Sequence, residues 1–180
     1  KFFHPDPSVE RQSGFLQPQI NSSKILGTSL LAPYFHVISD NKDATYKPTL
    51  FDSDIYMFSG EYRQENKNSS FIADLGLTKG YRSSSKDNNK NSIGHLFSKF
   101  DLDLGLKNFL ESDLNISLEK VTNDTYLKIF DTNLINTDKT IKPNNQNQLT
   151  SSVKLKLEHE NYKFTSGLTA YEKLNGGLSS

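Results

Sequence analysis

From about residue 24 to the end of the chain, apolar and polar residues alternate, and helical periodicity is nearly absent. In "HLFSKFDLDLGL" the residues that share one face with Ser98 are apolar: Leu96, Phe100, Leu102, Leu104 and Leu106. Successive side chains of a strand point to opposite faces, so the pattern predicts an antiparallel sheet with one apolar and one polar face. We expect about eight strands, at roughly 24–38, 44–51, 55–65, 70–79, 94–106, 111–121, 151–158 and 162–173.

Most of the connections between these strands are short and rich in turn residues, as hairpins require. Two are long, at 80–94 and 122–150. Within the second, "NDTYLKIFDTNLI" predicts a short helix with Asp124 as its cap, and "NTDKTIKPNNQNQ" predicts a flexible loop. Strand parity puts both long connections at the same end of the sheet.

An alternating antiparallel meander fits two architectures. In a soluble sandwich two apolar faces pack together, and in an outer-membrane barrel the apolar face meets lipid. Runs of about 9–13 residues favour membrane-crossing strands, as does the polar set of Asp, Lys, Glu and Asn on the other face. Aromatic residues near strand ends would form interfacial girdles: Tyr34, Phe35, Tyr46, Phe51, Tyr56, Phe58 and Tyr62. Alternation alone leaves both architectures open.

The first two predicted strands each contain a proline, Pro33 in "LLAPYFHVI" and Pro48 in "ATYKPTLF". Proline has no N–H to donate to a ladder and is normally kept out of paired strand interiors. From the residues alone, each proline marks either a bulge or ladder end, or a hairpin whose pairing is weakened for function.

Composition narrows the function classes. The chain has 21 basic and 21 acidic residues and thus no net charge, which removes the simplest case for nucleic-acid binding. With no Cys, neither a disulfide nor a thiolate metal site is possible in this segment. A hydrophobic content of 34% with 11% aromatics fits a one-sided sheet better than disorder. We find no membrane-spanning apolar run and no signal peptide, and the start without Met indicates a piece of a longer protein.

Residues that could carry catalysis are sparse. The histidines His4, His36, His95 and His159 lack metal-ligand spacing and are interpreted as ordinary polar side chains. Asp101 and Asp103 share a strand face and are interpreted as a lumen-facing acidic pair rather than an acid/base or cation site. "RQSG" lacks the first glycine of a nucleophile elbow. We therefore expect no enzyme activity, no cofactor and no metal.

The stretch from Phe3 to Phe51 resembles the LPS-assembly outer-membrane protein LptD family, also called organic solvent tolerance protein. The matching features are "HP" after aromatics, "RQSGFL", "SSKILG", "PYF", "DAT" and the second proline. "VTNDTYLKIF" resembles a segment between later strands of that family. The family protein is several times longer, and the resemblance covers the junction between its periplasmic jellyroll and its barrel. It thus divides the chain into a junction, 1–23, and the N-terminal strands of the transmembrane β-barrel, 24–180.

The resemblance implies transport without catalysis. The family inserts lipopolysaccharide into the outer leaflet of the Gram-negative outer membrane, through a barrel whose first and last strands separate. Its partners would be lipopolysaccharide, an LptE-type plug lipoprotein and, through the missing jellyroll, an LptA-type periplasmic bridge protein, with no nucleic acid. The resemblance places the lateral gate at Pro33 and Pro48. It places the jellyroll–barrel junction at Arg11, Gln12, Ser13, Gly14, Phe15 and Leu16. The family's usual jellyroll–barrel disulfides have no Cys in this segment. A self-contained eight-stranded outer-membrane barrel of structural or adhesive role, and a soluble β-sandwich binding module, remain the alternatives.

Overall fold

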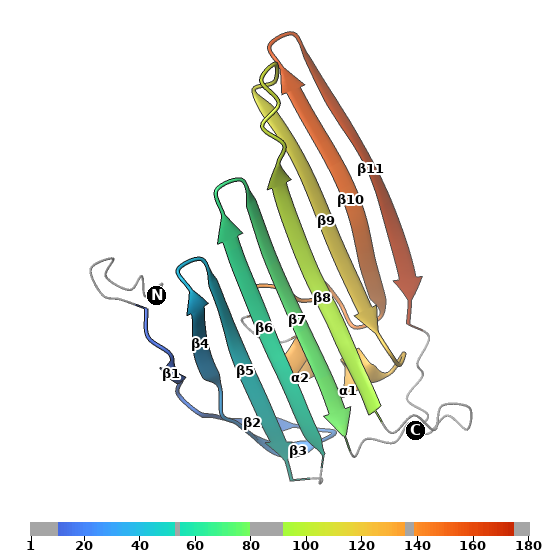
Figure 1. Cartoon of the computed structure of the whole chain (residues 1–180). Helices are drawn as coiled ribbons and strands as arrows, with labels where there is room; N and C mark the ends of the chain where they lie inside the picture. The colour runs from blue at the N-terminus through green and yellow to red at the C-terminus, as the bar shows by residue number, and fades with distance from the viewer. Residues whose placement is uncertain (1–10, 53–54, 80–91, 136–138, 175–180) are drawn as a thin grey trace.

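The computed structural model describes residues 11–52, 55–79, 92–135 and 139–174. In these residues all strands belong to one antiparallel sheet, which runs in chain order from one edge to the other (Figure 1). The bounds of its strands are β1 Gly14–Phe15, β2 Gln19–Ser23, β3 Gly27–Leu31, β4 Tyr34–Ser39, β5 Lys42–Phe51, β6 Tyr56–Asn66, β7 Ser69–Lys79, β8 Ser92–Asp103, β9 Glu111–Val121, β10 Gln148–His159 and β11 Tyr162–Lys173. The all-β, up-and-down architecture expected from the alternation is confirmed.

The first expected strand, 24–38, is two strands in the structure. β3 and β4 follow one another along the same edge of β5, and the ladder is interrupted at Ala32 and Pro33. An upstream segment lies along their other edge, with β2 paired to β3 and β1 paired to β4. Residues before 24 therefore take part in the sheet.

The sheet is open among the described residues. β11 pairs with β10, and β1 and β2 form the opposite edge. Neither the closed eight-stranded barrel nor the two-sheet sandwich left open by the sequence is observed: the edge strands do not meet, and the described strands form one sheet. Within the same residues, no helix is long and apolar enough to cross a membrane.

The two faces of the sheet differ in chemistry as alternation predicts. One face, which we call the outer face, carries Phe58, Leu75 and Leu77, and these side chains are 55%, 56% and 67% exposed. The opposite, inner face carries Glu61 and Asp74, which are buried. At Glu61 and Asp74 the polar face is therefore covered, whereas the apolar face opposite them is exposed.

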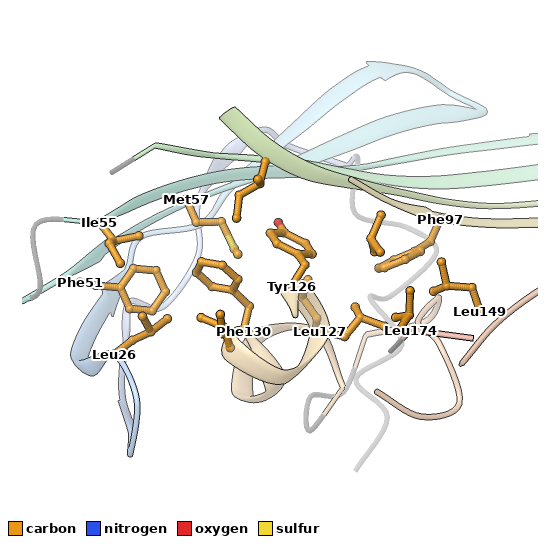
Figure 2. Packing of buried hydrophobic residues seen from close by; sticks show 14 residues of the cluster. Leu26, Phe51, Ile55, Met57, Phe97, Tyr126, Leu127, Phe130, Leu149 and Leu174 are labelled. Carbon is orange, nitrogen blue, oxygen red and sulfur yellow. The ribbon is translucent and has the colours of Figure 1, made fainter. Parts of the chain in front are cut away.

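The connection between β9 and β10 covers the inner face at one end of the sheet (Figure 1). Its described residues form two one-turn helices, α1 Tyr126–Ile129 and α2 Asp131–Leu134. Tyr126, Leu127 and Phe130 are fully buried and project toward Met57 and Phe97 of the sheet (Figure 2). The remaining members of this cluster are Leu26, Phe51, Ile55, Ile93, Val121, Ile129, Leu134, Leu149 and Leu174.

Two local expectations in this region are corrected. Asp124 is exposed and does not cap the helix; instead the Asn123 carboxamide oxygen accepts from the Thr125 backbone N–H at 2.9 Å and from its hydroxyl at 2.7 Å. Phe51, expected in an outer girdle, is 6% exposed on the inner face, where its ring packs edge-on against Phe130 at 5.8 Å. Phe35, also expected in the girdle, faces the inner side together with its partner Thr45. The expected residues Tyr34, Tyr46 and Phe58 do lie on the outer face, where they form a row of rings with His36.

The expected long connection at 80–94 falls largely on residues 80–91, which lie outside the described residues. β7 ends, and the described part of β8 begins, beside the strand end that carries Tyr56. The β9–β10 connection begins at this same end, since Thr122 donates its backbone N–H to Gly94 at 3.0 Å. Both long connections therefore leave the sheet at the same end, as strand parity predicts.

Candidate functional site

Pro33 and Pro48 lie at the same level of two neighbouring strands. The Ala32 backbone N–H donates to the Pro48 carbonyl at 3.2 Å, and the Leu16 backbone N–H donates to the Pro33 carbonyl at 2.9 Å. In an antiparallel ladder, such a pair normally exchanges two hydrogen bonds. Proline has no N–H, so Pro48 returns no bond to Ala32 and Pro33 returns none to Leu16.

The two missing donors act on different seams. The one at Pro48 thins the ladder between β5 and the β3–β4 strand, and the one at Pro33 thins the ladder between β4 and the upstream segment. The structure therefore brings the two expected gate residues together, one strand apart, at the edge of the open sheet.

The expected junction residues Arg11 to Leu16 lie along β4. Arg11 forms an ion pair with Asp43 of β5, and its guanidinium lies 5.6 Å from the centroid of the Phe35 ring. The Ser13 hydroxyl oxygen accepts the Val37 backbone N–H at 2.8 Å. Gln12 is exposed, and Gly14 and Phe15 form β1 opposite Phe35 and Tyr34.

A polar cavity of about 520 Å³ opens on the inner face beside Pro33. Its walls come from β2 to β6 on one side and from the β9–β10 connection on the other. Its charged side chains are ion-paired: Glu61 contacts Lys47 at 3.3 Å and Arg63 at 3.7 Å, and Arg63 contacts Asp43 at 2.8 Å. The uncharged polar side chains of its wall are Gln19, Asn21, Thr45, Thr49, Ser59, Thr132, Asn133 and Thr140. Amides, hydroxyls and paired charges suit a hydrophilic ligand with many hydroxyl groups.

Beside this cavity, a buried polar network fastens the connection to the sheet. The Lys139 ammonium contacts one Asp74 carboxylate oxygen at 2.5 Å, and the His95 Nε2 lies 3.4 Å from the other. The Tyr126 hydroxyl lies 3.0 Å from His95 Nδ1 and 3.3 Å from the Thr78 hydroxyl. Asp74, His95 and Thr78 belong to the sheet, whereas Tyr126 and Lys139 belong to the connection.

Burial sets the protonation behaviour of the two residues that the connection contributes. Desolvation raises the pKa of the Tyr126 hydroxyl, so that it stays protonated and can donate. Desolvation lowers the pKa of the Lys139 ammonium, and the Asp74 carboxylate opposes this effect. The Asp74 carboxylate thus stabilises the charged form of the buried Lys139 side chain.

Sequence reasoning missed this network and treated His95 as an ordinary polar side chain. Its ring is buried and stacks on Phe97 with the ring centroids 4.7 Å apart. It also lies directly over Gly76, where an added Cβ would come within 2.2 Å of His95 Cε1. A glycine opposite a histidine in the register was the one signal available, and it becomes readable only once the pairing of β7 and β8 is known.

Asp101 and Asp103 lie apart from the prolines, near the far end of β8 and on the same face as His95. Asp101 contacts Lys99 at 2.8 Å and accepts from the Asn115 amide at 2.7 Å. Asp103 accepts the Gly105 backbone N–H at 2.9 Å. Within the described ranges, no group of three or more His, Cys, Asp or Glu side chains is placed to hold a metal ion.

Comparisons with known proteins point in one direction. The chain is 27% identical over 123 residues to the LPS-assembly protein LptD of Polaromonas sp., which covers 68% of this chain and 15% of that protein. It is 26% identical over 179 residues to LptD of Legionella pneumophila strain Paris, which covers 92% of this chain and 20% of that protein. A shorter stretch of 53 residues is 42% identical to LptD of Ectopseudomonas mendocina, covering 29% of this chain and 6% of that protein.

No protein-family model matches the chain. The similarities support a distant relationship to proteins named LPS-assembly protein LptD. The chain spans a fifth or less of the length of these relatives.

Proposed function

We propose that this chain is the first part of an outer-membrane barrel that inserts lipopolysaccharide into the outer leaflet, and that its first strands form one side of a lateral gate. The observation that carries the proposal is the pair of one-way hydrogen bonds at Pro33 and Pro48, at the edge of an open sheet. The distant relatives named LPS-assembly proteins supply the ligand and indicate a transport rather than an enzymatic role.

The chemistry of the two faces supports a place in the membrane. In an outer-membrane barrel the apolar face meets hydrocarbon and the polar face lines the lumen. The exposed leucines and phenylalanines of the outer face fit the first role, and the polar cavity and ion pairs of the inner face fit the second. The acidic pair Asp101 and Asp103 would then face the lumen.

The physics of the edge supports gating. A barrel is stable in hydrocarbon because every backbone group is paired, and each unpaired group costs several kcal/mol. A strand with a missing donor has fewer bonds to break when it separates from its neighbour. The sugar portion of lipopolysaccharide would pass along the hydroxyl- and amide-lined inner face while its acyl chains leave through the opened seam.

Whole-protein partners follow from the same proposal. They are lipopolysaccharide, a plug lipoprotein of the LptE type, and a periplasmic bridge protein of the LptA type that would reach a jellyroll domain joined through residues 1–23. The full-length protein would lie in the outer membrane of a Gram-negative bacterium.

The test replaces each proline in the full-length protein by alanine. Pro48→Ala adds an N–H that faces the Ala32 carbonyl, and Pro33→Ala adds one that faces the Leu16 carbonyl. Each new bond should stabilise its seam by about 0.5–1.5 kcal/mol. We expect slower lipopolysaccharide export and a more permeable outer membrane, with the amount of folded barrel unchanged.

Leu50→Ala is the matched control, because Leu50 lies on the same strand and face as Pro48 and its replacement adds no donor. Normal export in both proline variants would contradict the gating role.

A further inference from the structure

The edge of β3 and β4 is already occupied by the chain itself. β2 pairs with β3 and β1 pairs with β4, so the segment from Gly14 to Ser23 occupies the backbone groups that a further strand would use to pair directly with β3 and β4. If the proposed function holds, the last strand closes the barrel at this side of the sheet, either on the free side of β1 and β2 or, where that segment leaves, directly on β3 and β4. In the second case the segment and the closing strand compete for the same backbone groups.

The segment is divided in two at Pro18. Leu16 lies opposite Pro33, whereas Gln19 lies opposite Leu31, so Gln17 and Pro18 together face the single residue Ala32. Two residues against one is the arrangement of a β-bulge, which interrupts the ladder. Pro18 also lacks an N–H. The segment therefore consists of two separately paired parts.

The part that contains β2 is firmly held. It forms five residue pairs with β3, from Gln19↔Leu31 to Ser23↔Gly27. The turn between them places Leu26 in the apolar cluster, where it is 4% exposed. The turn also has Gly27 at a φ of 70°, which glycine adopts without strain. The carboxylate of Asp52, which follows β5, accepts the Thr28 backbone N–H at 2.9 Å and ties the hairpin to the main sheet.

The part that contains β1 is weakly held. It forms two residue pairs with β4, and the neighbouring Leu16–Pro33 pair has only one of its two hydrogen bonds. Its other contacts with β4 are exposed: Phe15 is 81% exposed and meets the Tyr34 ring edge-on at 5.0 Å, and the Ser13 hydroxyl accepts the Val37 N–H at 2.8 Å. Arg11 adds an ion pair with Asp43, yet Asp43 keeps a second partner in Arg63 at 2.8 Å, so the departure of Arg11 leaves no unpaired buried carboxylate.

We propose that β2 is a permanent part of this edge and that β1 is an exchangeable strand, which holds the edge of β4 until the closing strand of the barrel displaces it. The interaction surface is thus the backbone edge of Tyr34–Ser39. Its two alternative occupants are Gly14–Phe15 and the last strand of the full-length protein. This inference rests on the proposed function for the identity of the second occupant.

Cysteine cross-links test the exchange. The sequence contains no cysteine, so introduced pairs are unambiguous within it. Phe15 and Tyr34 face each other in the register, as do Asn21 and Ser29, and directly opposed strand residues lie within disulfide reach. The experiment places each pair in the full-length protein in cells and measures cross-link formation by gel and lipopolysaccharide arrival at the surface.

We expect the Phe15→Cys/Tyr34→Cys lock to form, to reduce export several-fold, and to be relieved by reductant. The Asn21→Cys/Ser29→Cys lock should form more completely and leave export unchanged. Tyr34→Cys should also cross-link to a cysteine scanned along the last strand, and Phe15 should lose its cross-link in proportion.

The proposal would be overturned if the Phe15–Tyr34 cross-link left export unchanged, or if both cross-links reduced export equally. The absence of any cross-link between Tyr34 and the last strand would also overturn it. The cross-link yields do not depend on export, so they still report the occupant of the edge if Pro33→Ala and Pro48→Ala show that the gating role is wrong.

Discussion

The Lys139–Asp74 contact is a buried ion pair that ties the connection between β9 and β10 to the sheet. Asp74→Asn preserves the shape of the side chain and removes its charge. The Lys139 ammonium, whose side chain is 8% exposed, then loses the carboxylate it contacts at 2.5 Å. Removing one partner of a buried ion pair costs about 3–5 kcal/mol, because the other charge stays buried without compensation.

That cost falls on the local opening of the connection rather than on the sheet, which is held by its ladders. At 1.36 kcal/mol per factor of ten, the opening equilibrium should rise roughly a hundredfold to several thousandfold. Hydrogen exchange of the backbone amides of 122–135 and 139–147 in the full-length protein measures this equilibrium. We expect faster exchange there and unchanged exchange in β10 and β11.

A double-mutant cycle separates the ion pair from general damage. Lys139→Met removes the cation while it keeps the aliphatic length, so Asp74→Asn combined with Lys139→Met should open less readily than the two single effects predict. Glu158→Gln is the control, since Glu158 and Lys163 form a pair at 2.9 Å with side chains 36% and 56% exposed. It should change stability by at most about 1 kcal/mol. Additive single effects, or exchange unaffected by Asp74→Asn, would refute the reasoning.

Two further predictions use the same exchange measurement or the yield of folded protein. Tyr126→Phe removes the hydroxyl contacts with His95 and Thr78 and should cost about 1–3 kcal/mol, whereas Tyr126→Ala also empties a fully buried site and should cost about 3–5 kcal/mol. Unchanged exchange in Tyr126→Phe would show that the hydroxyl contributes nothing. Gly94→Ala should lower the folded yield, because the new Cβ would lie 2.3 Å from the Gly76 carbonyl oxygen. Gly60→Ala is the control and should be neutral, because its Cβ would meet the Tyr46 ring at 3.7 Å. A neutral Gly94→Ala would contradict the close approach of β7 and β8.

The strands were predictable because their signal is local. Alternation in β5 to β11 reflects two faces that differ in polarity along the whole length of each strand, and the observed bounds follow the expected ones within a few residues. The edge was harder to predict. β1 and β2 carry little alternation, and their pairing depends on neighbours that only the folded chain brings together.

The inner face was the least predictable part. The sequence "NDTYLKIF" indicated a helix, but nothing in it indicates that Tyr126 and Phe130 fold back over the sheet rather than away from it. That choice depends on a complementary apolar end of the sheet, formed by Met57, Phe97 and others far apart in the sequence. Phe51 was misplaced for the same reason, because its partner Phe130 comes from the connection.

The distribution of contacts gives the edge a direction of opening. The apolar cluster and the Asp74 network lie at the end of the sheet where the β2–β3 turn, Phe51 and the connection meet, and they hold that end through side chains from many strands. Toward the turn between β4 and β5, the described edge is held by its ladder, which Pro33 and Pro48 thin at one level, and by side-chain contacts such as the Arg11–Asp43 ion pair. Separating the edge strands therefore costs least between the prolines and the β4–β5 turn, and most between the prolines and the β2–β3 turn. We expect the edge to open from the Asp40 turn toward Pro33 and to stop there, with the β2–β3 hairpin still in place.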